Sequence, residues 1–272
     1  MSNNSTIRRE YESLWDKGFG AKYKVTKVLK PYESEEVSFE KLAHFVPMKG
    51  EKYDSSEIRL MLIGRAVNGW FDADVNTKSE YGNYIERLLI NDNGKFDWII
   101  EENGVLYNKN DLGSKGDYRL SSPFWDYSKS IFKILINDKK PDKYQEILSD
   151  ARWVDYIVWT NLYKIAPTYM DNPDKEMIKL QQAECINILK YEIERYKPTH
   201  ILAFTGWNDW FCNFAELMSE CNFIGTNVMR GKNKNSIYLE AVGKIGDAKV
   251  IVTCRPENRN KEQFLNDVCK EI

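Results

Sequence analysis

The sequence contains few of the residues from which metal sites and disulfide frameworks are built. It has only two histidines, His44 and His200, and its five cysteines are an odd number without a Cys-x-x-Cys pair. A structural zinc site needs a cluster of such ligands, and a disulfide framework needs an even set of cysteines. The sequence therefore predicts no metal site, and it predicts thiols that stay reduced.

Long apolar runs and an excess of one charge are also missing. No apolar stretch approaches the roughly 20 residues that cross a bilayer. The opening Met-Ser-Asn-Asn-Ser-Thr lacks the apolar stretch of a secretory signal. We therefore expect a cytoplasmic protein without membrane contact. Lys and Arg number 39 against 41 Asp and Glu, which argues against a strongly basic, nonspecific DNA-binding protein but leaves room for a local basic patch.

What the sequence does contain is an alternation of short apolar runs and amphipathic segments. Hydrophobic residues make up 42% of its 272 residues, enough for a substantial core in one large or two small domains. The runs of strand length are Ile58–Ile63, Asp155–Thr160, Thr199–Thr205 and Lys249–Cys254, with a more polar, edge-type run at Ser236–Val242. The helical segments are Pro123–Ile136, Asp174–Tyr196, Trp207–Glu220 and Asn258–Ile272. This order predicts an α/β protein with three layers, α/β/α, around a central, mainly parallel sheet of four or five strands.

Two regions depart from the alternation. Residues 1–55 are charged and show no sustained period, and we interpret them as an N-terminal extension that packs on the core, with one helix at Thr6–Lys17. The stretch Asn91–Leu120 is rich in Asn, Asp, Gly and Lys, which is typical of a long loop or hairpin insertion. The main α/β domain is predicted to span residues 56–272.

Four segments follow the predicted buried strands, and they carry side chains that are unusual for simple connections. They are Gly64–Trp70, Asn161–Lys164, Gly206–Asp209 and Arg255–Arg259. In an open parallel sheet, ligands bind beyond the carboxyl ends of the strands. The amides, aromatic rings and arginines of these segments suit a planar polar ligand such as a nucleobase, and we expect them to meet at one edge of the sheet.

The same segments belong to a longer series of motifs. In order, these are the loop after Gly64, Trp159–Lys164, Glu184–Cys185 on a long helix, Lys197–Gly206 and Val252–Pro256. This order resembles the uracil-DNA glycosylase superfamily over residues 56–270. The resemblance implies a water-positioning residue in the first loop, an Asn that reads the base edge, and a motif after the last strand that steadies the leaving base. The cysteine pattern of the family's iron–sulfur branches is missing, so we expect no cofactor.

Two asparagines match positions in this resemblance. Asn161 matches the base-reading Asn, because an amide offers both a donor and an acceptor to a base. The alternative is an Asn that caps the turn after its strand. Asn68 lies in the first loop, where it would position the attacking water. The acidic residues of the familiar variants are missing there, and Asp72 or Asp74 could supply the charge, although acidic loop residues are usually only solvated.

Arg255 stands where the family has a histidine. An arginine cannot shuttle a proton, but its positive charge could stabilise a departing anionic base. The alternatives are an arginine on a surface loop or one that contacts phosphate. The usual apolar wedge is absent, because Glu257-Asn258-Arg259-Asn260 is wholly polar. Without a wedge, single-stranded DNA or a free base or nucleotide becomes the more plausible ligand.

The remaining candidates for substrate binding are aromatic, basic or backbone contacts. Trp70 in the first loop and Phe124 at the start of a helix could stack on a base, although most helical aromatics belong to a core. Gly64, Arg65 and Arg259 lie in the strand-end segments and are predicted substrate contacts. The basic turn Arg230–Lys234 could touch phosphate, but solvated charge is the more ordinary interpretation.

These residues favour a DNA N-glycosylase that removes uracil or another modified base. The alternative is a module of the same fold that binds nucleic acid or nucleotide without cleaving it, which the substituted first and last motifs favour. An unrelated α/β hydrolase is a weaker candidate, because the sequence has no Gly-x-Ser-x-Gly elbow and no histidine at the carboxyl end of a predicted strand.

Overall fold

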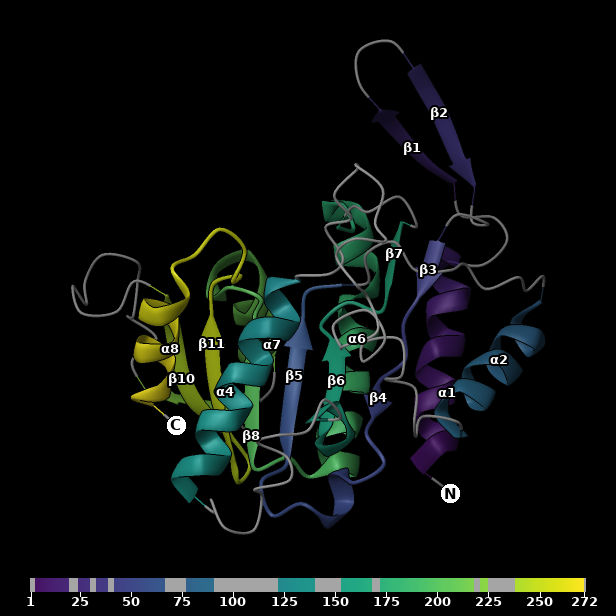
Figure 1. The fold of residues 1–272 in the computed structure, drawn as a ribbon. Coiled ribbons are helices and arrows are strands. Elements are labelled where there is room, and N and C mark those ends of the chain that lie inside the picture. Colours follow the sequence, from purple (N-terminus) through teal and green to yellow (C-terminus); the bar gives the residue numbers. More distant parts are fainter. Residues whose placement is uncertain are drawn as a thin grey trace, which may run out of the picture. The chain divides into compact units, whose positions relative to one another are not determined.

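The computed structural model (Figure 1) describes residues 3–19, 24–29, 33–38, 42–66, 77–90, 122–139, 153–167, 172–217, 221–224 and 238–271. Its helices are α1 (Asn3–Leu14), α2 (Lys78–Ile90), α4 (Pro123–Lys139), α6 (Lys175–Tyr196), α7 (Cys212–Leu217) and α8 (Lys261–Cys269). Shorter turns of π- or 3₁₀-helix are η1 (Trp15–Phe19), η3 (Tyr53–Ser55), η5 (Trp153–Tyr156) and η6 (Trp207–Phe211). None of the described helices is both long enough and apolar enough to cross a membrane.

The chain divides into two compact units that alternate along the sequence. Unit 1 contains Met1–Pro47, Gly64–Asp92 and Thr160–Tyr196, and unit 2 contains Met48–Ile63, Asn93–Trp159 and Lys197–Ile272. The predicted N-terminal extension, residues 1–55, and the main domain, residues 56–272, stay predictions. The predicted insertion Asn91–Leu120 and the basic turn Arg230–Lys234 lie outside the described residues.

A seven-stranded sheet forms the centre of unit 2. Two of its strands end with residues that belong to unit 1, namely Gly64 in one strand and residues 160–161 in the other. Its order is β4 (Met48–Lys49), β6 (Ile157–Asn161), β5 (Leu60–Gly64), β8 (His200–Ala203), β11 (Ala248–Thr253), β10 (Leu239–Ile245) and β9 (Cys221–Ile224). The β5–β8 and β8–β11 pairs are parallel. The β4–β6, β10–β11 and β9–β10 pairs are antiparallel.

The predicted α/β class is therefore confirmed. The sheet was predicted to be mainly parallel with four or five strands, whereas it is mixed and has seven strands among the described residues. The four apolar runs became β5, β6, β8 and β11, because nearly every side chain in them is buried. The fifth run became β10, which is not an edge strand, since β9 pairs with it. The strand β4 has only two residues, too few for an apolar pattern to show, and in β9 a polar Asn222 interrupts the apolar residues.

Aromatic side chains pack the helices of unit 2 against the sheet. The Phe124 ring on α4 lies 5.3 Å from the Phe204 ring at the end of β8, and the Tyr127 ring on α4 lies 4.9 Å from Phe264 on α8. Such edge-to-face pairs stabilise by about 1 kcal/mol beyond the area they bury. Asn260 caps the N-terminus of α8, because its side chain accepts a hydrogen bond from the Gln263 N–H at 3.0 Å.

Unit 1 is built around α1, α2 and α6. Its buried core contains one face of each helix together with two antiparallel strands, β3 (Leu42–His44) and β7 (Ile165–Pro167). A separate antiparallel pair joins β1 (Lys24–Leu29) and β2 (Glu33–Ser38). The predicted helix at Thr6–Lys17 corresponds to α1 and η1. The helix α2 and these four strands were not predicted, since residues 1–55 and 78–90 show no clear period and β7 has only three residues.

His44 is fully buried in unit 1, where its Nδ1 lies 2.9 Å from the Tyr81 hydroxyl. Burial lowers the pKa of His44 from 6.5 to about 3, because an imidazolium would lose its hydration. The unfolded chain therefore binds a proton that the folded chain excludes when the pH lies between these two values. The stabilising contribution is complete above pH 6.5 and is lost as the pH falls.

We expect His44→Gln to remove this pH dependence. Between pH 7.5 and pH 5, the wild type should lose about 2 kcal/mol of unfolding free energy through His44 alone. The difference in unfolding free energy between wild type and variant should therefore change by that amount. Urea unfolding of both proteins at the two pH values measures it, and a constant difference would contradict the assignment.

Candidate functional site

The strand-end segments of unit 1 lie side by side. The Leu162 N–H donates to the Gly64 carbonyl at 2.9 Å, and the Tyr163 N–H donates to the Arg65 carbonyl at 2.9 Å. These bonds join the chain after β6 to the chain after β5. The structure therefore brings together three predicted site residues, Gly64, Arg65 and Asn161. Gly64 and Asn161 are buried, and Arg65 is half-buried.

Asn161 is the most informative of these residues. It ends β6, and only 1% of its surface is exposed. Among the described residues, its side-chain Nδ2 has no hydrogen-bond partner. A buried N–H donor that stays unpaired costs about 1 to 3 kcal/mol, and native proteins satisfy nearly all such groups. Within the described part of the chain, that nitrogen does not cap the turn after β6.

A fully buried ion pair supports the backbone at this position. The Lys164 Nζ donates three hydrogen bonds, to Glu192 Oε1 at 2.7 Å, to Thr160 Oγ1 at 2.7 Å and to the Asn161 carbonyl at 2.8 Å. The Thr160 hydroxyl in turn donates to Glu192 Oε2 at 2.7 Å. Both charged side chains are 0% exposed. All three protons of the ammonium therefore have acceptors, which compensates much of the cost of burying the charges.

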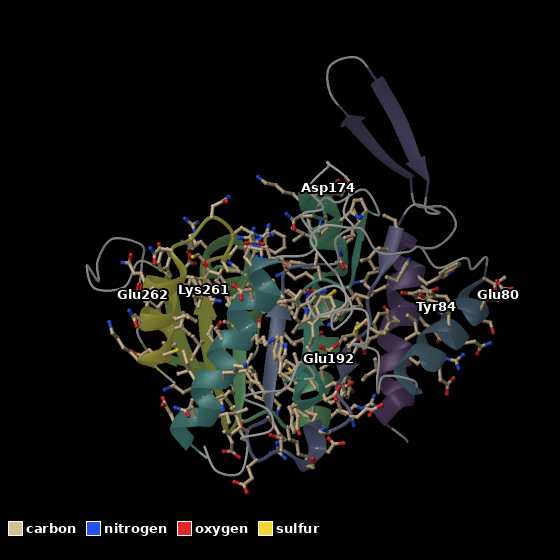
Figure 2. The ribbon with its side chains drawn as sticks, in the orientation of Figure 1. Glu80, Tyr84, Asp174, Glu192, Lys261 and Glu262 are labelled. Atoms are coloured by element: carbon tan, nitrogen blue, oxygen red, sulfur yellow. The ribbon has the colours of Figure 1, made fainter. Side chains whose placement is uncertain are left out.

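Glu192 lies on α6 and is labelled in Figure 2. Burial raises the pKa of Glu192, and the Lys164 ammonium opposes that rise. The Lys164 ammonium therefore favours the charged form of Glu192.

Gln181 on α6 fixes the chain that follows. Its Oε1 accepts hydrogen bonds from the N–H groups of Lys164 and Ile165 at 3.1 and 3.0 Å, and its Nε2 donates to the Ile165 carbonyl at 2.8 Å. Cys185, one turn further along, donates to the same Oε1. Burial raises the pKa of the Cys185 thiol to about 12, so this cysteine is not a nucleophile at neutral pH.

Sequence reasoning missed these supporting residues, although a signal was present. Gln181, Cys185, Ile188 and Glu192 recur at spacings of four, three and four, so they share one face of α6. That face is buried. A glutamine and a glutamate within an otherwise apolar helical stripe indicate buried polar partners, although the stripe does not say which residues supply them.

The strand ends of unit 2 also adjoin one another. The Phe204 N–H donates to the Ile63 carbonyl at 3.0 Å, and the Gly206 N–H donates to the Thr253 carbonyl at 2.8 Å. Gly206 has a φ of 81°, a left-handed conformation that favours glycine. The next residue, Trp207, donates its N–H to Glu240 Oε2 at 2.6 Å. The loops after β8 and β11 are thus joined, as expected for parallel strands.

Arg255, the residue predicted to stabilise a leaving base, is exposed and paired. Its Nε donates to Glu257 Oε2 at 3.0 Å, and a second bond runs from its Nη2 to the other carboxylate oxygen. Arg259 is also exposed, and its Nε donates to the Arg255 carbonyl at 3.4 Å. Phe124 is half-buried, with its ring 4.9 Å from Trp125. The catalytic and stacking roles of these residues stay predictions.

Two predicted site residues, Asn68 and Trp70, lie outside the described residues, as do Asp72 and Asp74. Over the part of the chain that the structure describes, no group of three or more His, Cys, Asp or Glu side chains is placed to hold a metal ion.

No family model matches the sequence, and no curated protein matches it significantly. The interpretation of the site therefore rests on its residues. The firmest of them is Asn161, because its burial, its backbone support and its free donor are all set by described contacts in unit 1.

Proposed function

We propose that the protein recognises a keto-bearing nucleobase in DNA and hydrolyses its N-glycosidic bond, as a DNA glycosylase on a three-layer, uracil-DNA glycosylase-like fold. The observation that carries this proposal is the buried Nδ2 of Asn161, which has no partner among the described residues. A donor held in a dry, rigid position needs an acceptor, and the exocyclic carbonyl of a base is such an acceptor.

The same donor explains which bases would be rejected. Uracil and hypoxanthine carry a carbonyl on their pairing edge, whereas cytosine and adenine carry an amino group there, which is itself a donor. Opposed donors would leave both groups unpaired in a buried place. The resulting discrimination is expected to be about 10- to 100-fold, since an unsatisfied buried donor costs about 1 to 3 kcal/mol.

The remaining roles in the proposal come from the sequence. Asn68 would position the attacking water, Arg255 would stabilise the departing base, and Trp70 or Phe124 would stack on it. Gly64, Arg65 and Arg259 would contact the substrate, which is single-stranded DNA in preference to duplex because the wedge position is polar. Each of these residues is tested by its own substitution.

One observation favours a second function, a module that binds the base or nucleotide without cleaving it. The Glu257 carboxylate already neutralises the Arg255 guanidinium. A guanidinium in such a pair stabilises a new anion less well than a free one, because its charge and donors are shared. Under this alternative, Asn161 still reads a keto base, but no bond breaks.

The deciding experiment measures both binding and base release. Single- and double-stranded oligonucleotides that carry uracil, hypoxanthine or an oxidised base, with cytosine and adenine controls, are incubated with wild type, Asn161→Ala and Asn161→Asp. We expect release of a keto base by the wild type. Both variants should lose at least about 10-fold in rate, with Asn161→Asp the worse because it replaces a donor with an acceptor.

Asn187→Ala is the matched control. Asn187 lies on the exposed side of α6 in the same unit, where its Nδ2 donates to Glu10 Oε2 at 3.2 Å. This variant should behave as the wild type does. Keto-selective binding without release would favour the second function. Absence of both selective binding and release would refute the proposal and its alternative together.

A further inference from the structure

The Asn161–Leu162 peptide is held from both of its sides. Its carbonyl accepts a hydrogen bond from Lys164 Nζ at 2.8 Å, and its N–H donates to the Gly64 carbonyl at 2.9 Å. A peptide group is planar, so these two bonds fix its orientation and leave little freedom at the Asn161 Cα. The fixed backbone sets the direction of the Asn161 Cα–Cβ bond, from which the side-chain amide extends.

The Lys164 ammonium, which holds the Asn161 carbonyl and is called the clamp below, is itself bound by buried groups. Lys164 Nζ has its other two bonds with Glu192 and Thr160, both within 2.7 Å. Glu192 comes from α6, and Thr160 immediately precedes Asn161 in the chain. Since Lys164 and Glu192 are 0% exposed, solvent neither screens their attraction nor competes for their hydrogen bonds.

Stability alone does not explain why the buried Lys164–Glu192 pair also binds the Asn161 carbonyl. Buried ion pairs are often no better for stability than well-packed apolar residues of similar volume, because desolvation offsets the attraction. Here one of the three ammonium bonds is directed to the backbone of Asn161, whose own side-chain donor has no partner among the residues that the structure describes. Precise orientation of such a donor is what a recognition site requires, since small displacements cost much of its selectivity.

We propose that Lys164 and Glu192 are positioning residues that orient the Asn161 amide for base recognition. The inference rests on the proposed function in taking Asn161 as the base-reading residue. Neither Lys164 nor Glu192 touches the base. They act through the carbonyl of Asn161, and their loss therefore weakens selectivity for keto bases without removing the amide itself.

The test uses the double variant Lys164→Met/Glu192→Leu, which removes both charges and the clamp while keeping similar volume. The matched control is Lys17→Met/Glu184→Leu. It removes another Lys–Glu pair of α6, with Nζ and Oε2 2.6 Å apart, in the same unit and with the same change in net charge. Both variants are prepared as full chains, and their folding is checked by circular dichroism and urea unfolding.

The first readout needs no ligand. In protein labelled with ¹⁵N-asparagine, the side-chain amide signals of Asn161 are assigned by their loss in Asn161→Ala. We expect one sharp pair in the wild type and in the control variant. In Lys164→Met/Glu192→Leu, the pair should broaden or split, because the amide samples several orientations. Unchanged Asn161 signals in that folded variant would overturn the positioning role.

The second readout is selectivity for uracil over cytosine in otherwise identical single-stranded oligonucleotides. The clamp variant should lose about 10-fold in selectivity, and adding Asn161→Ala to it should lower selectivity no further than Asn161→Ala does alone. Independent, additive losses would overturn the proposal. If the wild type shows no selectivity, the proposed function fails, while the amide signals still decide whether Lys164 and Glu192 orient Asn161.

Discussion

Lys164→Met is expected to destabilise the protein by about 3 to 5 kcal/mol, measured as the unfolding free energy in urea at pH 7.5. The methionine keeps most of the volume of the lysine side chain, so loss of packing is small. The cost arises because Glu192 and Thr160 lose the Lys164 ammonium, their hydrogen-bond partner at 2.7 Å. The Glu192 carboxylate, which is 0% exposed, is then a buried charge without an opposite charge beside it.

The pH dependence of this variant identifies the cause. Burial already raises the pKa of Glu192, and loss of the Lys164 charge raises it further. The folded variant then binds a proton that the unfolded chain releases, so the variant recovers stability as the pH falls from neutral toward 4.5. Adding Glu192→Leu should restore most of the loss at pH 7.5. A double variant as unstable as the single one would refute this explanation.

Gly50→Ala is expected to cost about 3 kcal/mol or to prevent folding of unit 2. Gly50 follows β4, and its N–H donates to the Ile157 carbonyl at 2.9 Å. An added Cβ would lie 2.2 Å from the carbonyl carbon and oxygen of Asp155 and 2.4 Å from the Val154 oxygen. Backbone atoms cannot swing aside as a flexible side chain can, so the β4–β6 contact would have to open.

Gly246→Ala is the control for this substitution. Gly246 has a φ of 55°, but an added Cβ there meets nothing within 4 Å. Its cost is conformational strain alone, about 1 to 2 kcal/mol. Thermal and urea unfolding of the two variants separate the two effects. Equal losses at Gly50 and Gly246 would show that close packing at Gly50 is unimportant.

The candidate site shows where sequence reasoning succeeded and where it stopped. Asn161 could be found because it directly follows a continuous apolar run, and the residue after a buried strand lies at a sheet edge. That its Nδ2 is buried without a partner in the described part of the chain could not be predicted, since this depends on which groups surround it. Similarly, Arg255 was placed after β11, but its pairing with Glu257 is a matter of side-chain geometry.

Strand number was misjudged for a related reason. The runs that became β5, β6, β8 and β11 are buried, and burial requires apolar residues at nearly every position. By contrast, β4 has only two residues, and Asn222 interrupts the apolar residues of β9. Their backbones pair because a longer neighbour offers unused hydrogen-bonding groups, and this condition leaves no trace in their own composition.

The sequence by itself determined the α/β class, the buried strands and the main helices, because continuous apolar runs and helical periodicity are local properties of the chain. Tertiary structure alone decided that Lys164 reaches back to Asn161 and across to Glu192, 28 positions further along. The reason is physical. A local pattern records whether a residue is buried, but only the folded chain brings a buried charge to the one partner that can compensate it.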